Sequence, residues 1–539
     1  MACHPHQYGQ HCTSGGDEFS AGLVNTHAIN TSNWRNTASL WSARFGARPH
    51  GHLARPVNKE GPLLIELATA VHQAANTCTA TAAPAACQPS WLDTGSNSWQ
   101  LTAATFVGLM SVPGLALLYG GLVPKKWVVN TMFMAFSGFS AVLIVWVLWA
   151  YKMGFGAPVG GGTANTWSYT YGSNFFKNFF YNFVGHPETS LRGSSQISQA
   201  SLTANGGTSL PLSQATAALF YFQFVFAAIT PLLFLGSVIG RIKIKVWIIF
   251  VPLWTTFVYA INAMLIWGGG YWAHEGAVDY SGGYVIHLAA GTSGFVAAWV
   301  IGPRLARDRT RFLPHSLPLV SIGAGIIWLG WNGFNGGDPY FASADAATAV
   351  MNTNLATVAA LLTWVLCDMF LSKSKKPTFL GAVNGMIVGL VAITPGAGFV
   401  NGFGALLEGI IASVIVWFAW TYLQPILIKR VDDAMGVLYT HGIAGLCGGL
   451  LVGIFADPSV VVYPFTTSGS AFAATGWLYG HPKLFEEQLL AAITIIVWDA
   501  VVTFIILKAI SIFTPLRMSD EDLEIGDLAI HGEEAYPED

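Results

Sequence analysis

The chain has few charged residues, since Asp, Glu, Lys and Arg make up only 10% of its 539 residues. A soluble domain carries roughly 25%, so most of this chain is not a soluble globular fold. The formal net charge of −3 gives no argument for a nucleic-acid partner. Six scattered cysteines are too few for a disulfide scaffold, and only Cys78 and Cys87 are close enough to suggest a bridge.

Recognisable catalytic and cofactor patterns are also scarce. The chain has no paired Cys-x-x-Cys motif and no glycine-rich nucleotide loop after a strand. The histidines near the N-terminus match no compact set of metal ligands. We therefore expect a protein that is not an enzyme and that holds neither a cofactor nor a metal.

Apolar residues are what the chain has in abundance. They make up 53% of it, with 59 glycines and 20 tryptophans, and the mean hydropathy is +0.51. This composition is typical of a polytopic membrane protein with closely crossing helices and interfacial aromatic residues.

Residues 1–95 differ from the rest, because they are rich in His, Ser, Thr and Arg and poor in acids. The stretch lacks the apolar core of a secretory signal peptide. We expect a disordered or poorly structured extension, although its composition also resembles a transit peptide.

The remainder contains eleven apolar segments, each near the length of about 20 residues that a helix needs to cross a bilayer. They cover residues 98–121, 128–154, 215–238, 244–267, 281–302, 316–335, 344–371, 378–396, 401–423, 437–456 and 487–513. The loops after the odd-numbered segments from first to ninth carry fourteen Lys and Arg residues, against four at the other side. The positive-inside rule places the N-terminus outside and the C-terminus in the cytoplasm.

Two of these segments contain the same pattern, H-x-x-A-G-x-x-G, beginning at His287 and at His441. The small residues three, four and seven positions on lie along the histidine's face of a helix and let another helix approach closely. A buried imidazole inside a membrane is costly, so it marks a functional site by default. A hydrogen-bonded packing histidine is the alternative for either one alone, but two copies favour a transport pathway.

The two histidines lie 154 residues apart, in segments five and ten, which enter the membrane from opposite sides. This arrangement predicts an all-α fold of eleven transmembrane helices, with a 5+5 inverted repeat and one added C-terminal helix. The predicted parts are a membrane domain at 96–513, repeats at 98–302 and 316–456, an extra helix at 487–513 and a regulatory tail at 514–539. We expect the long outer loop at 155–213 to be mobile and assign it no site.

Aromatic residues flank the predicted pathway at its outer end. Trp267 is followed by three glycines, and Phe222 and Phe226 lie one helical turn apart. Such rings can hold a small cation, with roughly 0.5–2 kcal/mol for each contact. Most of the tryptophans form an ordinary interfacial belt, and Trp267 differs because glycines follow it.

Acidic residues gather in the same outer loops, namely Glu275, Asp279, Asp338 and Asp345. Their charge would attract a cation. Asp279 has a second interpretation, since it precedes the glycines of segment five and could cap that helix. In the apolar middle, Asp368, Glu408 and Asp499 do not lie beside either histidine in the sequence. The pathway therefore suits a species such as ammonium, which enters charged and crosses as a neutral molecule, past two neutral histidines.

Four stretches carry a resemblance to a known family. They are Asp279–His287, Gly330–Gly337, Asp432–His441 and His531–Tyr536. Together they resemble the ammonium transporter/methylammonium permease/Rhesus family over more than 400 residues from about Trp99, closest in the tail to plant type-2 ammonium transporters.

The resemblance implies a homotrimer in the plasma membrane with one pore in each subunit. His287 and His441 correspond to the family's twin histidines, Trp267 to its outer cation-binding ring, Phe226 with Phe334 to its gate, and Phe222 to an additional recruitment aromatic. It implies ammonium, methylammonium or ammonia as the transported species.

Three positions depart from the family pattern. Asp338 replaces a common Ser and either strengthens cation binding or lies in the loop. Ala157 stands where many relatives have an acid, and Ala529 stands where type-1 plant relatives have a phosphorylatable Thr.

Other functions are compatible with twin histidines in a membrane. One is a haem oxidoreductase with His287 and His441 as axial ligands. Another is an ammonium sensor without meaningful flux, and a third is a Rhesus-type channel for ammonia or carbon dioxide gas. Ammonium capture, deprotonation and conduction as ammonia is the leading hypothesis, and the fate of the released proton stays open.

Overall fold

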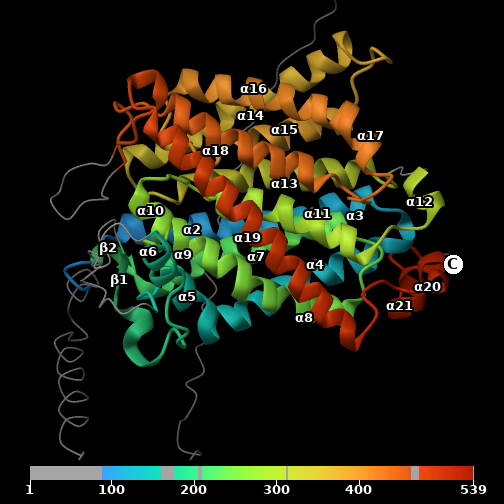
Figure 1. Cartoon of the computed structure of the whole chain (residues 1–539), viewed down its shortest axis with the longest axis horizontal. Helices are drawn as coiled ribbons and strands as arrows, with labels where there is room; N and C mark the ends of the chain where they lie inside the picture. The colour runs from blue at the N-terminus through green and yellow to red at the C-terminus, as the bar shows by residue number, and fades with distance from the viewer. Residues whose placement is uncertain (1–87, 160–174, 204–208, 311–313, 463–472, 538–539) are drawn as a thin grey trace, which may run out of the picture. The chain divides into compact units, whose positions relative to one another are not determined.

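The structure is a computed structural model. It describes residues 88–159, 175–203, 209–310, 314–462 and 473–537. The chain divides into two compact units, Met1–Cys87 and Gln88–Asp539. The first unit lies outside the described residues, and with it the suggested Cys78–Cys87 bridge. The described part of the second unit is helical except for one two-stranded sheet (Figure 1).

The first half of the membrane domain consists of five apolar helical segments, several of them interrupted by a single π-helical turn. In chain order the elements are α2 (Thr94–Leu109), η2 (Met110–Gly114), α3 (Leu115–Leu122), η3 (Lys125–Trp127), α4 (Val128–Val145), η4 (Trp146–Ala150), α5 (Tyr151–Phe155), α7 (Thr216–Val238), α8 (Ile244–Trp254), η6 (Thr255–Tyr259), α9 (Ala260–Ile266), α10 (Tyr271–Glu275), η7 (Gly283–Leu288) and α11 (Ala289–Ile301).

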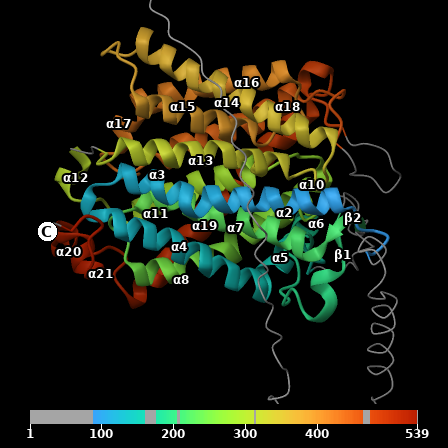
Figure 2. The same ribbon diagram turned by 180° about the vertical axis from the view of Figure 1, so that it is seen from behind.

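The second half repeats this plan and is followed by one long helix. Its elements are α12 (Ala306–Thr310), α13 (Leu317–Gly336), α14 (Ala344–Phe370), α15 (Phe379–Ile393), α16 (Gly402–Phe418), η8 (Ala419–Leu423), α17 (Gln424–Leu427), η9 (Leu438–Ile443), α18 (Ala444–Phe455), η10 (Trp477–Tyr479) and α19 (Lys483–Phe513). Figures 1 and 2 show α13–α18 along one side, α2–α11 along the other, and α19 running obliquely across them.

The predicted membrane segments are confirmed. Among the described residues, ten helices are long and apolar enough to cross a bilayer, and α15 is a shorter apolar helix that supplies the eleventh. Several boundaries have a local cause. The side chains of Ser316, Thr378 and Asn401 accept from backbone N–H groups at the starts of α13, α15 and α16. Such N-caps satisfy donors that have no partner inside the helix.

The two halves meet through glycine at the repeated pattern. A Cβ on Gly291 would lie 2.2 Å from the Cα of Gly442, so no larger residue fits between α11 and η9. A Cβ on Gly294 would lie 2.5 Å from the Ser237 hydroxyl, and one on Gly448 would lie 2.0 Å from the Ala392 carbonyl oxygen. The glycines of the two patterns thus serve two purposes. Gly291 and Gly445, at the fourth position after each histidine, lie where the two halves meet. Gly294 and Gly448, at the seventh position, pack on α7 and α15.

The long loop after α5 has regular structure in its described part. It contains α6 (Phe175–Tyr181), η5 (Gly193–Ile197) and an antiparallel pair, β1 (Gln199–Thr203) and β2 (Ser209–Ala215). Phe183 of this loop packs edge-on against Trp498 of α19, with ring centroids 4.6 Å apart. The loop therefore joins its neighbouring helices in a defined way.

Loops that carry the basic residues come together at one end of the domain, which we call the basic end. Arg304 pairs with Asp432 through two hydrogen bonds of 2.9 and 2.7 Å, and its backbone N–H also donates to that carboxylate. Arg241 donates to the Asp432 carbonyl oxygen. These hydrogen bonds connect the loops after α7, α11 and α17. The loops therefore lie at the same end of the domain, as the segregation of Lys and Arg in the sequence predicts.

The tail folds back on the basic end. It forms α20 (Asp520–Ile525) and α21 (Asp527–His531). Both oxygens of Asp527 accept backbone N–H groups at the start of α4, from Val129 at 2.7 Å and from Asn130 at 2.9 Å. Lys126 donates to the Leu523 carbonyl oxygen. A carboxylate at a helix N-terminus is stabilised by the free donors there.

Candidate functional site

The two repeated histidines face each other in the middle of the domain. Their Nδ1 atoms are 3.4 Å apart, and their rings are 5.4 Å apart at an interplanar angle of 26°. His287 has no exposed surface and His441 has 5%. One Nδ1 must carry a proton and the other accept it, so the pair consists of two complementary tautomers when neutral. With their Nδ1 atoms in hydrogen-bond contact, the two rings leave no space for a haem iron between them, which argues against the haem alternative.

Each histidine lies on a π-helical turn of the same length. His287 is the fifth residue of η7, and His441 is the fourth of η9. A π turn displaces side chains from the regular helical spacing and occurs often at functional sites. The two turns direct the imidazoles toward each other from opposite halves.

A carboxylate holds the start of each of these turns. Asp279 accepts four backbone N–H groups, two on each oxygen, from residues 282–285 at 2.6–3.0 Å. Asp433 accepts two, from Val437 at 3.1 Å and Leu438 at 2.9 Å. The structure thus places Asp279 as a helix cap. Asp433 was missed from sequence, although each acid precedes its histidine by eight residues, and this repeated spacing would have identified it.

Aromatic rings form a continuous row from the histidine pair toward the other end of the domain. Phe334 lies 5.9 Å from His287 and stacks on Phe226 at 4.2 Å and 18°. Phe222 follows at 4.6 Å from Phe226. Trp331 stacks on His287 at 5.2 Å and is fixed by a hydrogen bond to Thr394. The structure therefore brings the two predicted gate residues together in direct contact, directly above His287.

Trp267 lies beside this row. Its ring is 6.2 Å from that of Phe226, and its Nε1 donates to the Asp279 carbonyl oxygen at 2.6 Å. The turn that caps η7 therefore also orients the tryptophan. Trp267 stays half-buried, whereas the two rings of the gate have no exposed surface.

Asp338 follows α13 at the same end of the domain and is 4% exposed. Its neighbours are Ser281, on the turn that holds Trp267, and Tyr340, whose ring contacts Phe222. Its Oδ2 has no hydrogen-bond partner among the described residues. The loop interpretation is therefore insufficient, because the side chain is packed among the residues that hold the aromatic rings.

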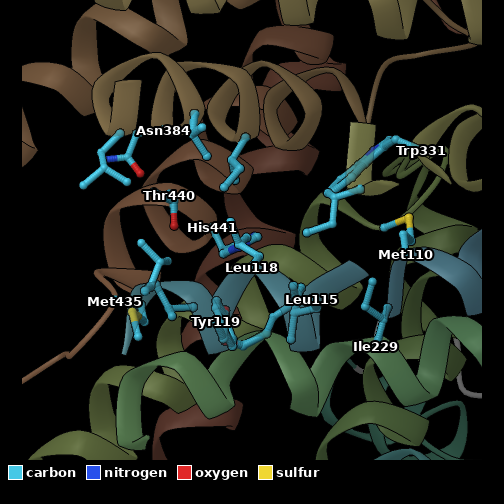
Figure 3. Close-up of a pocket in the computed structure, with 17 residues that line it drawn as sticks. Met110, Leu115, Leu118, Tyr119, Ile229, Trp331, Asn384, Met435, Thr440 and His441 are labelled. Atoms are coloured by element: carbon cyan, nitrogen blue, oxygen red, sulfur yellow. The ribbon is translucent and has the colours of Figure 1, made fainter. Parts of the chain in front are cut away.

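On the other side of the histidine pair lies an apolar cavity with a volume of about 50 Å³. Figure 3 shows His441, Thr440 and Tyr119 among the side chains that line it, together with Leu, Ile and Met residues. The hydroxyls of Thr440 and Tyr119 donate to the carbonyl oxygens of Gly436 and Leu233. No Asp, Glu, Lys or Arg lines it among the described residues. Such a cavity suits a small neutral molecule better than an ion.

The other intramembrane acids are engaged elsewhere or lie away from the pair. Asp368 accepts from Trp417, and Asp499 accepts twice from Asn262. Glu408 is fully buried, lies against Gly396, and has no hydrogen-bond partner among the described residues. None of the three is hydrogen-bonded to either histidine. The part of the chain that the structure describes also contains no cluster of metal-ligating side chains.

Comparison with known proteins agrees with this architecture. The profile of the family described as "Ammonium Transporter Family" matches residues 98–536. "Ammonium transporter 2" of Arabidopsis thaliana is 44% identical over 458 residues, covering 83% of this chain and 89% of that protein. "Ammonium transporter 3 member 3" of Oryza sativa subsp. japonica is 43% identical, covering 83% and 90%.

Solved structures give the same result. The crystal structure of Saccharomyces cerevisiae Mep2 superposes with a TM-score of 0.65 at 29% identity, covering 80% of this chain and 89% of that one. A structure titled "Sensor Amt Protein" has a TM-score of 0.66 at 22% identity, which shows the fold alone. With eleven membrane helices, paired histidines and relatives along most of its length, the chain is an integral membrane protein of the ammonium transporter family.

Proposed function

We propose that this protein transports ammonium across a membrane by binding the cation at the Trp267 end and conducting ammonia past the two histidines. The observation that carries the proposal is the uninterrupted sequence of aromatic site, stacked gate, paired imidazoles and apolar cavity within one chain. The family membership and the named relatives support the same activity.

Capture depends on charge and ring faces. The half-buried Trp267 is the ring that meets a small cation, with Phe226 at 6.2 Å and Phe222 next to Phe226, and a cation–ring contact contributes about 0.5–2 kcal/mol. Asp338 adds a carboxyl oxygen that no protein donor occupies among the described residues. Below this site, Phe226 and Phe334 stack at 4.2 Å, so the rings must separate before anything passes.

Conduction depends on losing the proton. The histidine pair and the cavity beyond it offer hydrogen-bonding nitrogen and apolar surface, and the described residues that line the cavity include no carboxylate to balance a charge. The His287 Nε2 has no partner among the described residues and is therefore available to a guest molecule. A neutral ammonia can both donate to and accept from the imidazoles. A metal cation meets only the cost of desolvation there.

The domain also has a preferred orientation and assembly. The basic end faces the cytoplasm by the positive-inside rule, which puts Trp267 outside and the tail inside. Each chain contains a whole pathway, because both histidines and the complete row of rings come from one chain. A homotrimer in the plasma membrane, with one pore in each subunit and a regulatory tail, follows from the family resemblance.

The test is uptake of labelled methylammonium by cells that lack their own ammonium transporters. Expression of the protein should restore uptake. His287→Ala should abolish it, since the pair loses its hydrogen bond, and Trp267→Leu should raise the KM by weakening capture. Replacement of both histidines should stop conduction or admit K⁺.

Two matched variants control for loss of a histidine or tryptophan as such. His481 is an exposed histidine of the loop before α19, and Trp299 is a 58% exposed tryptophan on the outside of α11. His481→Ala and Trp299→Leu should keep the uptake of the wild type. Intact selective uptake in both His287→Ala and Trp267→Leu would show that the assignment of the pathway is wrong.

A further inference from the structure

The carboxyl group of Asp338 is buried at the outer mouth of the pathway and is only partly satisfied. Its Oδ2 has no partner among the described residues. Ser281 lies beside it, but the Ser281 hydroxyl donates to the Phe334 carbonyl oxygen at 3.0 Å. The Tyr340 hydroxyl accepts from Gln223 and keeps its own proton for the carboxyl. A buried carboxyl oxygen without a donor is costly unless a ligand completes it.

The residues beside this carboxyl are linked to the rings of the cation site. Tyr340 packs edge-on against Phe222 with ring centroids 6.0 Å apart. Gly337, next to Asp338, lies so close to Phe222 that a Cβ there would be 2.3 Å from the ring. Ser281 belongs to the turn whose Asp279 carbonyl holds Trp267. Asp338 therefore lies between the residues that position Phe222 and those that position Trp267.

We propose that Asp338 makes the outer site a binding site for monovalent cations in general, so that K⁺ and Rb⁺ block transport competitively without passing. The inference rests on the proposed function of this site. A carboxylate and aromatic faces attract any compact cation by its charge. Nothing in that chemistry requires a proton that can be lost.

Selection would then occur below the site. Ammonium leaves it by breaking one N–H bond, with the proton passing to the Asp338 carboxylate or to outer water, and continues as ammonia between the Phe226 and Phe334 rings once they separate. Rb⁺, which is similar in size, has no proton to release and stays on the carboxylate until it returns outside. Burial raises the pKa of the Asp338 carboxyl. A bound cation, which favours the ionised form, and a proton are thus alternative partners for the same oxygen.

The first experiment measures methylammonium uptake by the full-length chain at increasing RbCl, with N-methylglucamine chloride keeping the ionic strength constant. Rb⁺ should raise the apparent KM of the wild type and leave its maximal rate unchanged, while radioactive rubidium does not enter. Asp338→Asn and Asp338→Ser should weaken inhibition by Rb⁺ about tenfold or more, since they remove a buried charged partner. Glu486→Gln, which removes an exposed carboxylate in the first turn of α19, should keep the wild-type inhibition.

A second measurement does not depend on transport. RbCl should raise the melting temperature of the purified wild-type protein relative to N-methylglucamine chloride, because a ligand of the folded state stabilises it. Asp338→Asn should show no such difference. Uptake that Rb⁺ leaves unaffected, or an equal thermal shift in the wild type and Asp338→Asn, would overturn the role of Asp338 while leaving ammonium transport intact. If RbCl raised the melting temperature but the protein took up no methylammonium, the transport function alone would be refuted.

Discussion

The outer and inner halves of the pathway begin from the same sequence pattern and are surrounded differently. In both, an aspartate eight residues before a histidine caps a π-helical turn. Around His287 the wall is aromatic and closed, with Trp331 and Phe334 within 6 Å of its ring. His441 instead opens onto the apolar cavity. The repeat fixes where the histidines lie, and the neighbouring helices decide that the wall is aromatic around one and apolar beside the other.

The two aspartate caps also differ, in the number of backbone donors that each satisfies. Asp279 satisfies four backbone donors and also orients Trp267, whereas Asp433 satisfies two. The Asp279 turn therefore fixes His287 and Trp267 relative to each other. Among the described residues, the Asp433 turn positions no aromatic ring in this way, and His441 beside it lines the apolar cavity.

Removal of the two aspartate caps should give the largest difference in stability between the two halves. Asp279→Ala leaves four donors without an acceptor and should destabilise the folded protein by about 4 kcal/mol, against about 2 kcal/mol for Asp433→Ala. The measurements are melting temperature in detergent and methylammonium uptake. Asp279→Asn, which retains one accepting oxygen, should lie between the wild type and Asp279→Ala. Equal losses from the two alanine variants would contradict the asymmetry.

The glycine contact between the halves provides the next test. Gly291→Ala places a Cβ 2.2 Å from Gly442 and should cost about 3 kcal/mol through overpacking, with loss of uptake because the imidazoles move apart. Gly325 of α13 is the matched control, since a Cβ there meets nothing within 4 Å. Gly325→Ala should be neutral or stabilise by about 0.5–1 kcal/mol. If both variants melt at the same temperature, the close contact does not hold the halves together.

At the basic end, the docking of the tail can be tested with a substitution that touches no residue of the pore. Asp527→Ala removes the acceptor for two N–H groups of α4 and should weaken tail docking by about 1–2 kcal/mol. Limited proteolysis should then cut residues 514–539 faster than in the wild type. Glu521→Ala, an exposed position on α20, should leave the cleavage rate unchanged. Unchanged proteolysis of both variants would show that Asp527 does not hold the tail.

Protonation of Asp457, in the loop after α18, should give the smallest effect on stability, and only at acid pH. Burial opposes its ionisation, but hydrogen bonds from Ser459, Asn401 and Tyr479 lower the pKa of Asp457 to about 2. Its contribution is therefore complete above the ordinary pKa of about 4 and disappears as the pH falls through 2.

The size of this contribution is about 1 kcal/mol. Between pH 5 and pH 3 the melting temperature of the wild type should fall more than that of Asp457→Asn, whose side chain does not titrate. The wild type should be the more stable of the two at pH 5. Identical pH profiles would show that these hydrogen bonds do not favour the ionised form.

Much of the membrane architecture is predictable from local features. The apolar runs have the length of the bilayer, and Ser316, Thr378 and Asn401 end loops with side chains that cap helices. The histidine pattern identifies the centre of both halves, and the family resemblance points to Phe226 and Phe334 as the gate. The π turns at both histidines were not predictable, because a single inserted residue leaves no mark on an apolar sequence. The one sequence signal for Asp433 is its position eight residues before His441, which repeats the spacing of Asp279 and His287.

Composition, run length and the two histidine patterns by themselves determined that this protein spans a membrane with eleven helices and carries a duplicated polar centre. Only the tertiary structure decided that Trp331 stacks on His287 and that Asp279 both caps a helix and accepts from Trp267. It also decided that Asp338 is buried with an oxygen that finds no donor in the described part of the chain. The physical reason is the sequence separation over which each effect acts. The length of an apolar run and the capping of a helix depend on residues close together in the chain, whereas these contacts join residues that only helix packing brings together.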